Sequence, residues 1–126
     1  MHPIIEVQEA LVMALKSDAA LLALVGGAVF DAPAKGQAPP YVVIRRHDIV
    51  QRDGDLAVLQ EHRLLVHCWA DQPSRRRVLE SVERVVAVAR GLDAVTHAEH
   101  VRTDTVIDDE TGLARAAVAL RFLSEE

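Results

Sequence analysis

The chain of 126 residues lacks the composition that marks several common protein classes. Its only cysteine, Cys68, cannot form an internal disulfide, which fits a reducing compartment. Four aromatic residues are few, so a core must be built from valine, leucine and alanine. No apolar run approaches the ~18–20 residues that cross a bilayer, and the N-terminus lacks a basic segment followed by an apolar one. We therefore expect neither a membrane span nor an export signal.

Positive charge is also in short supply. The chain has 14 Lys and Arg against 19 Asp and Glu, which gives a formal net charge of −5. This balance disfavours a free-standing nucleic-acid binder, because such proteins attract phosphates with a basic face. Half of the residues are hydrophobic and 26% are charged, as in ordinary globular proteins. Length and composition predict one folded domain over residues 1–126.

Signatures of catalytic and nucleotide sites are missing from the sequence. None of the four serines lies in a Gly-x-Ser-x-Gly turn that would expose a nucleophile. Gly26 and Gly27 are not followed by the spaced glycine or the Lys-Ser/Thr pair that cradle phosphates. Cys68 falls on the apolar side of an expected strand, where a thiol is inert. The sequence predicts no catalytic residue and no cofactor.

The histidines do not form a metal site by their spacing. His62 and His67 are five residues apart on an expected strand, so they point to opposite faces. His97 and His100 are expected in a loop, where two imidazoles without a further ligand make a poor site. We expect no bound metal.

Apolar periodicity predicts three helices. The first covers residues 3–16 and starts at Pro3, and the second covers residues 19–25, with Ser17 or Asp18 as its cap. A third and longer helix follows Ser74 and closes at Gly91. On the outer face of this helix, Glu80 and Arg84 have the i, i+4 spacing of an ion pair.

Alternating apolar residues predict two hairpins. Residues 41–52 and 58–70 pair around a turn at 53–55, and residues 101–108 and 113–123 pair around a turn at 109–112. A short extended start at residue 29 precedes a proline-rich loop. The fold class is α+β: a mainly antiparallel sheet of two hairpins, with about four to five strands, packed against the long helix and the N-terminal helix as a single pair of layers.

Several segments, in order along the chain, carry a family resemblance. They are VQEAL at 7–11, LKSDAAL at 15–21, LVGGAVFDAP at 24–33, PPYVVI at 39–44, LVHCWA at 65–70 and DDETG at 108–112. Together these packing and turn motifs resemble the small tail-completion, or tail-terminator, proteins of long-tailed phages and phage-like gene transfer agents. The resemblance spans nearly the whole chain and includes no catalytic signature.

The resemblance implies a structural protein of the virion or gene-transfer-agent particle, located at the head–tail junction and assembled in the bacterial cytoplasm. Its subunits would form a homo-oligomeric ring, typically hexameric, on the last ring of the tail tube protein. The ring would stop tube polymerisation and face a head-side stopper or connector protein. DNA would meet it only in transit through the channel, and no membrane would be involved.

Contact residues are nominated by their chemistry, because the family supplies no motif that assigns them. A ring requires two different patches on each subunit. Aromatic, proline-rich and charged-turn residues are expected at contacts with other subunits or with the tube. The contact candidates are Pro33, Pro39, Pro40, Tyr41, Arg52, Asp53, Asp55, Trp69 and, as second choice, Arg75, Arg76 and Arg77. The candidates for an acidic channel lumen that repels DNA are Asp108, Asp109 and Glu110.

Two other interpretations stay open. A head–tail stopper or connector protein also forms rings, although an adaptor would be mostly helical. A small enzymatic or ligand-binding α+β domain would have a deep pocket between sheet and helix, with convergent polar groups and a titratable residue perturbed by burial.

Overall fold

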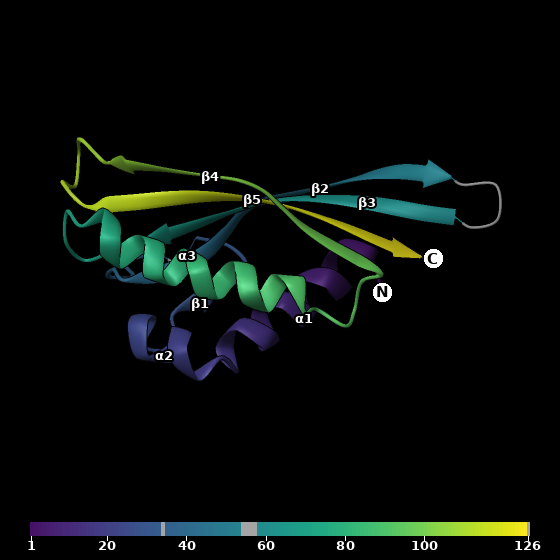
Figure 1. The fold of residues 1–126 in the computed structure, drawn as a ribbon, viewed down its shortest axis with the longest axis horizontal. Helices are drawn as coiled ribbons and strands as arrows, with labels where there is room; N and C mark the ends of the chain where they lie inside the picture. The colour runs from purple at the N-terminus through teal and green to yellow at the C-terminus, as the bar shows by residue number, and fades with distance from the viewer. Residues whose placement is uncertain (34, 54–57, 126) are drawn as a thin grey trace.

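A computed structural model describes residues 1–33, 35–53 and 58–125. Figure 1 shows the three helices gathered on one side of a long, twisted five-stranded sheet. The α+β class, both hairpins and all three predicted helices are confirmed. In chain order the elements are α1 (Pro3–Lys16), α2 (Ala19–Val25), β1 (Val29–Phe30), β2 (Tyr41–Asp53), β3 (Val58–Trp69), α3 (Arg75–Arg90), β4 (His97–Ile107) and β5 (Ala114–Glu125).

The helix ends follow the capping residues of the sequence. Of the two candidates for α2, Asp18 is the cap, and its Oδ2 accepts a hydrogen bond from the Leu21 backbone N–H at 3.0 Å. The helix stops at Gly26, whose φ of 62° is a left-handed conformation that favours glycine. Ser74 caps α3 by accepting from the Arg77 backbone N–H at 3.2 Å.

The strands are ordered β1-β2-β3-β5-β4, with β1 parallel to β2 and all other pairs antiparallel. The register shifts just before Arg46 in β2 and again just before Arg102 in β4. These two bulges share one row of the sheet, because Leu65 pairs with Arg46 and with Ala119, and Ala119 pairs with Arg102.

The core lies between the helices and the inner face of the sheet. Leu64, Val66 and Cys68 on β3 are buried there, as the alternation of that strand predicts. Cys68 is fully buried in the core, and this burial raises the pKa of its thiol to about 12. Strand β2 adds Val42 and Ile44 to this core, and β5 adds Ala114, Ala116, Val118, Leu120 and Phe122.

Two local expectations are wrong. His97 and His100 lie in β4, not in a loop, because the pairing with β5 extends to Leu123. They point to opposite faces of the sheet and do not converge.

The ion pairs of α3 also differ from the expected i, i+4 pair. Arg84 reaches across to Asp18 and donates through both Nε, at 3.0 Å, and Nη2, at 2.8 Å. Glu80 lies 3.7 Å from Arg76 instead. The Asp18 carboxylate therefore both caps α2 and ties it to α3.

Candidate functional site

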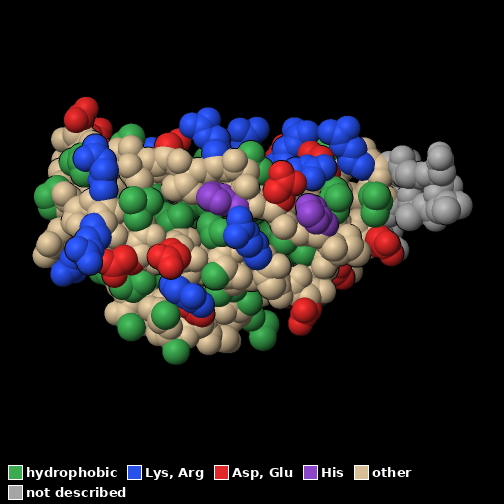
Figure 2. Space-filling view, viewed as in Figure 1, with side chains coloured by type: hydrophobic (Ala, Val, Ile, Leu, Met, Phe, Trp, Pro, Cys, Tyr) green, Lys and Arg blue, Asp and Glu red, His purple; other side chains and the backbone are tan. Residues whose placement is uncertain are grey.

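The outer face of the sheet, which no helix covers, collects most of the arginines. Figure 2 shows a row of basic side chains along the sheet side of the molecule. The strand registers place seven of the chain's twelve arginines on this face: Arg45, Arg46, Arg52, Arg63, Arg102, Arg115 and Arg121. The same registers place five carboxylates there, Asp48, Glu61, Glu99, Asp104 and Glu125. This face is therefore net positive in a chain whose total charge is −5.

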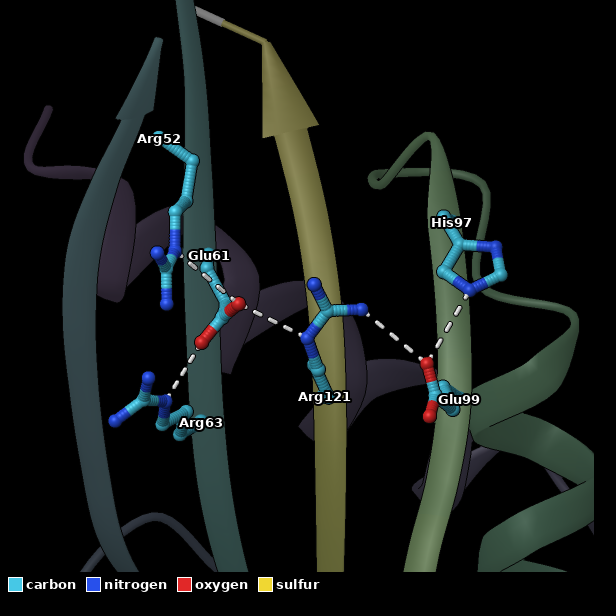
Figure 3. A network of polar contacts seen from close by, with 6 residues as sticks. All are labelled: Arg52, Glu61, Arg63, His97, Glu99 and Arg121. Carbon is cyan, nitrogen blue, oxygen red and sulfur yellow. Dashed lines mark hydrogen bonds and ion pairs between the residues drawn. The ribbon is translucent and has the colours of Figure 1, made fainter.

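A buried carboxylate organises three of these arginines. Glu61 is only 3% exposed although it lies on the uncovered face. Its oxygens accept hydrogen bonds from Arg63 Nε at 2.6 Å and Arg121 Nε at 2.9 Å, and Arg52 Nε lies 3.5 Å away. Figure 3 shows the three guanidinium groups turned toward this one carboxylate from β2, β3 and β5. We call Arg52, Arg63 and Arg121 the arginine cluster.

The electrostatics of the cluster favour full charge. Hydrogen bonds, first from Arg63 and then from Arg121, hold the pKa of Glu61 below its usual value against the opposing effect of burial. The hydrogen bond to Glu61 in turn raises the pKa of Arg121. Arg121 also donates through Nη1 to Glu99 at 3.2 Å, and His97 Nε2 lies 3.6 Å from the same carboxylate.

The opposite end of this face is aromatic. Tyr41 and Trp69 are register partners on β2 and β3, and their rings stack with centroids 6.4 Å apart. Pro33, Tyr41 and Trp69 line a hollow of about 240 Å³ together with Arg45, His67 and Arg115, among others. Burial first, then the charges of Arg115 and Arg45, lower the pKa of His67 to about 4. The structure thus brings together three of the predicted contact residues.

A second hollow joins the sheet to α3. It has a volume of about 310 Å³ and is lined by residues that include Pro40, Trp69 and Arg77. Trp69 therefore borders both hollows, and Arg77 lies 3.6 Å from Asp71 at the same edge. Of the remaining arginine candidates on α3, Arg75 and Arg76 are exposed on the first turn of the helix.

The other predicted contact residues are scattered. Arg52 lies at the far end of β2, in the arginine cluster. Asp53 ends the same strand, Asp55 lies outside the described residues, and Pro39 precedes Pro40 in the loop that leads into β2. The candidates therefore divide between two ends of the sheet and do not form one patch.

One of the three carboxylates in the acidic turn between β4 and β5 is hydrogen-bonded within the turn. Asp108 Oδ2 accepts from the backbone N–H and the hydroxyl of Thr111, both at 2.9 Å, and these bonds lower its pKa. Asp109 and Glu110 are exposed, and their side chains make no hydrogen bond or ion pair with any described residue. We call Asp109 and Glu110 the acidic tip.

A buried chain of polar groups escaped the sequence analysis. His47 Nε2 lies 2.7 Å from His62 Nδ1, and His62 Nε2 lies 2.9 Å from Ser124 Oγ. Burial is the main cause that lowers the pKa of His47, to about 4, and also that of His62. The order serine, histidine, histidine is that of a nucleophile, a base and an orienting group.

The surroundings of Ser124 favour a structural explanation. Ser124 is 8% exposed and His62 is fully buried, and Ser124 pairs with Gln60 inside the β3–β5 ladder. A nucleophilic serine needs access to its substrate and nearby N–H groups that stabilise the developing oxyanion. The backbone around Ser124 instead takes part in the β3–β5 ladder. The three side chains satisfy one another's polar atoms beneath the helices, with His47 Nδ1 left unpaired.

The sequence analysis could not bring the arginine cluster and the His62–Ser124 pair together, because both depend on strand pairing. Alternation indicates that Arg63 and Arg121 face outward, but only the β3–β5 pairing places them beside one carboxylate.

Within the described residues, no group of three or more His, Cys, Asp or Glu could hold a metal ion. The helices found over the described ranges are too short or too polar to span a membrane.

The chain resembles known proteins both in its sequence and in its fold. Residues 9–125 match the family described as "Tail completion protein gp17". A search of curated proteins finds no match. Among solved structures, a chain from the "Virion of native gene transfer agent (GTA) particle" superposes with a TM-score of 0.85 and 21% sequence identity, and the match covers 100% of both chains. At that identity, the likeness establishes a shared fold.

Proposed function

Because the chain belongs to the tail completion protein gp17 family, we propose that it forms a ring that closes the tail tube of a long-tailed phage or a phage-like gene transfer agent. In this proposal the ring sits on the last ring of the tube protein, stops further polymerisation and joins the tube to a head-side connector. DNA passes through its centre. The function needs shape and charge complementarity and no reacting group.

The family match over residues 9–125 is the observation that carries the proposal. The common fold with a chain of a gene transfer agent virion supports it, because that chain is part of an assembled particle. The surface adds further support. A ring subunit needs one patch for each neighbour, and this chain has an aromatic end and an arginine end on one sheet face.

We assign the aromatic end to contact with the tail tube or with a neighbouring subunit. Tyr41 and Trp69 have the large, rigid side chains that dominate protein interfaces, and Pro33 and Pro40 extend the surface on either side. Arg77 borders the same region and is the arginine of α3 best placed to add a charged contact. A lumen position for Asp108, Asp109 and Glu110 is a prediction from the sequence alone and is not one of the contacts assigned here.

Deletion of the gene tests the proposed function. Without a terminator, tubes should grow past their normal length and heads should fail to join them, as seen by electron microscopy of purified particles. Complementation with the wild-type chain should restore both features. Tails of normal length carrying heads in the deletion strain would overturn the proposal.

Substitution at the aromatic end tests the contact assignment. Trp69→Ala should leave a folded chain that no longer enters particles, whereas Lys16→Ala, at an exposed site on α1, should enter normally. Circular dichroism would establish folding before particles are probed. If the chain is found on the head-side connector and not on the tube, the stopper interpretation replaces this one.

A further inference from the structure

The arginine cluster is arranged to receive an acidic partner. All three of its arginines approach Glu61 through Nε, the inner edge of the guanidinium group. The outer edge of each group, formed by the two Nη atoms, is therefore directed away from Glu61, and only Arg121 has an Nη bond with another described residue. Side chains of Arg52 and Arg63 are 53% and 52% exposed. Guanidinium edges of this kind bind carboxylates with two parallel hydrogen bonds.

The anchoring carboxylate lowers the cost of binding. A free arginine loses side-chain entropy when it is fixed at an interface. Here Glu61 already contacts all three heads and Glu99 pairs with Arg121, so two carboxylates face three guanidinium groups and one positive charge is left. The cluster is therefore pre-organised and still positive, which favours an anionic protein surface as its occupant.

The same chain carries a matching group at its other end. The acidic tip lies at the β4–β5 turn, whereas Arg121 lies near the end of β5, eight residues beyond Leu113. At ~3.3 Å per strand residue this separates the two by about 26 Å, too far for contact within one molecule. Both carboxylates of the tip are exposed and unpaired among the described residues.

We propose that the arginine cluster of one copy binds the acidic tip of the next copy, so that subunits join head to tail. Opposite charges at opposite ends of one chain generate a heterologous contact, which closes into a ring when the rotation between neighbours allows it. The inference rests on the proposed function, and it names the surfaces that the ring would use. It also assigns the acidic tip to a subunit contact and not to the lumen.

Cross-linking inside assembled particles tests the contact. Leu123 pairs with Glu61 and lies beside the cluster, so a chain with Leu123→Cys and Glu110→Cys places one thiol at each surface while retaining the arginines and Asp109. The native Cys68 is buried and its thiol pKa is raised to about 12, so it will not react in the folded chain. A short bis-maleimide should give a ladder of multiples of the 13.8 kDa chain.

Matched controls make the outcome decisive. Leu123→Cys combined with Met13→Cys, at a 70% exposed site on α1, should give no ladder. Yield for the test pair should fall as salt is raised from 0.1 M to 1 M, because the Debye length shrinks from ~10 Å to ~3 Å. A band that stops at the dimer, or an equal ladder in the control, would overturn head-to-tail docking.

Two further outcomes separate the inference from the proposed function. Particles that contain the chain but give no ladder overturn the inference alone, whereas particles that lack the unmodified chain overturn the proposed function. Binding of a short DNA duplex that is lost in Arg63→Gln, together with an absent ladder, would show that the cluster receives phosphates instead.

Discussion

Arg63 and Arg121 face each other as register partners on β3 and β5, yet both donate through Nε to a single carboxylate, Glu61. Like charges directly opposite one another on a sheet repel. The pairing is tolerated because Glu61, two residues before Arg63 on the same face, lies between the two guanidinium groups. The carboxylate is thus a structural requirement of this face as well as a charge.

Removal of that charge should destabilise the fold. Glu61→Gln retains the side-chain shape but removes the negative charge and replaces one of the two acceptor oxygens by an NH2 donor that faces three cations. We expect a loss of about 1–2 kcal/mol in the free energy of unfolding, at the lower end for charged hydrogen bonds because the arginines remain partly in water. Urea denaturation at pH 7 measures it. Glu99→Gln, which removes a half-exposed carboxylate of the same network, should cost less than ~0.5 kcal/mol.

Stability should fall as the pH is lowered from about 6.5 to about 4. Burial lowers the pKa of His47 to about 4, and that of His62 is lowered for the same main reason. In this window the unfolded chain therefore binds protons that the folded chain does not, and each such histidine costs ~1.4 kcal/mol per pH unit.

Urea midpoints measured between pH 7 and pH 4.5 would test this dependence. His47→Gln removes one of the two titrating groups and should reduce the slope of stability against pH. The carboxyl pKa values of Asp18 and Glu61 are lowered from 3.8 and 4.5, so the stability that these two groups contribute is lost only at the acid end of this window and below it. Equal midpoints throughout the window would contradict the prediction.

The Asp18 carboxylate should contribute through two separable interactions. Asp18→Asn keeps an oxygen that can cap α2 but loses the ion pair with Arg84, whereas Asp18→Ala loses both. We expect the alanine variant to be less stable than the asparagine variant by about 1 kcal/mol, the usual value of an N-cap. The hydrogen bond from Arg84 lowers the pKa of Asp18. The wild-type chain should therefore be more stable than Asp18→Asn above pH ~4, and this difference in stability should vanish as the pH falls through the pKa of Asp18 in the folded chain.

Ser124 should be chemically inert. A fluorophosphonate probe labels serines that are activated by a histidine base, but Ser124 is 8% exposed and lies in a sheet ladder. We expect no labelling of the folded chain, and esterase activity equal in wild type and Ser124→Ala. Labelling that disappears in Ser124→Ala would support the enzymatic alternative that the sequence leaves open.

The local signals of the sequence predict the fold well because they are short-range. Asp18, Ser74 and Gly26 fix helix ends through atoms within a few residues, and the alternation of β5 fixes which side chains are buried. Strand order is different, since β5 inserts beside β3 only through long-range pairing. Features that depend on the strand order could therefore not be predicted from the sequence.

The polar clusters are such features. Glu61 meets Arg121 across 60 residues of sequence, and His62 meets Ser124 across 62. Periodicity gives the face on which each residue lies but not its neighbour on the next strand. The sequence nominates Tyr41 and Trp69 one by one as contact residues, but the stacking of their two rings follows from the β2–β3 register.

The two bulges that share a row of the sheet have a geometric consequence. Each extra residue bends its strand and increases the local right-handed twist, and here both lie level with Leu65 and Ala119. The sheet is strongly twisted, so the strands overlap at mid-length in the view of Figure 1 and the two halves of the uncovered face point in different directions. One rigid subunit can thereby present two contact surfaces in different orientations without any hinge.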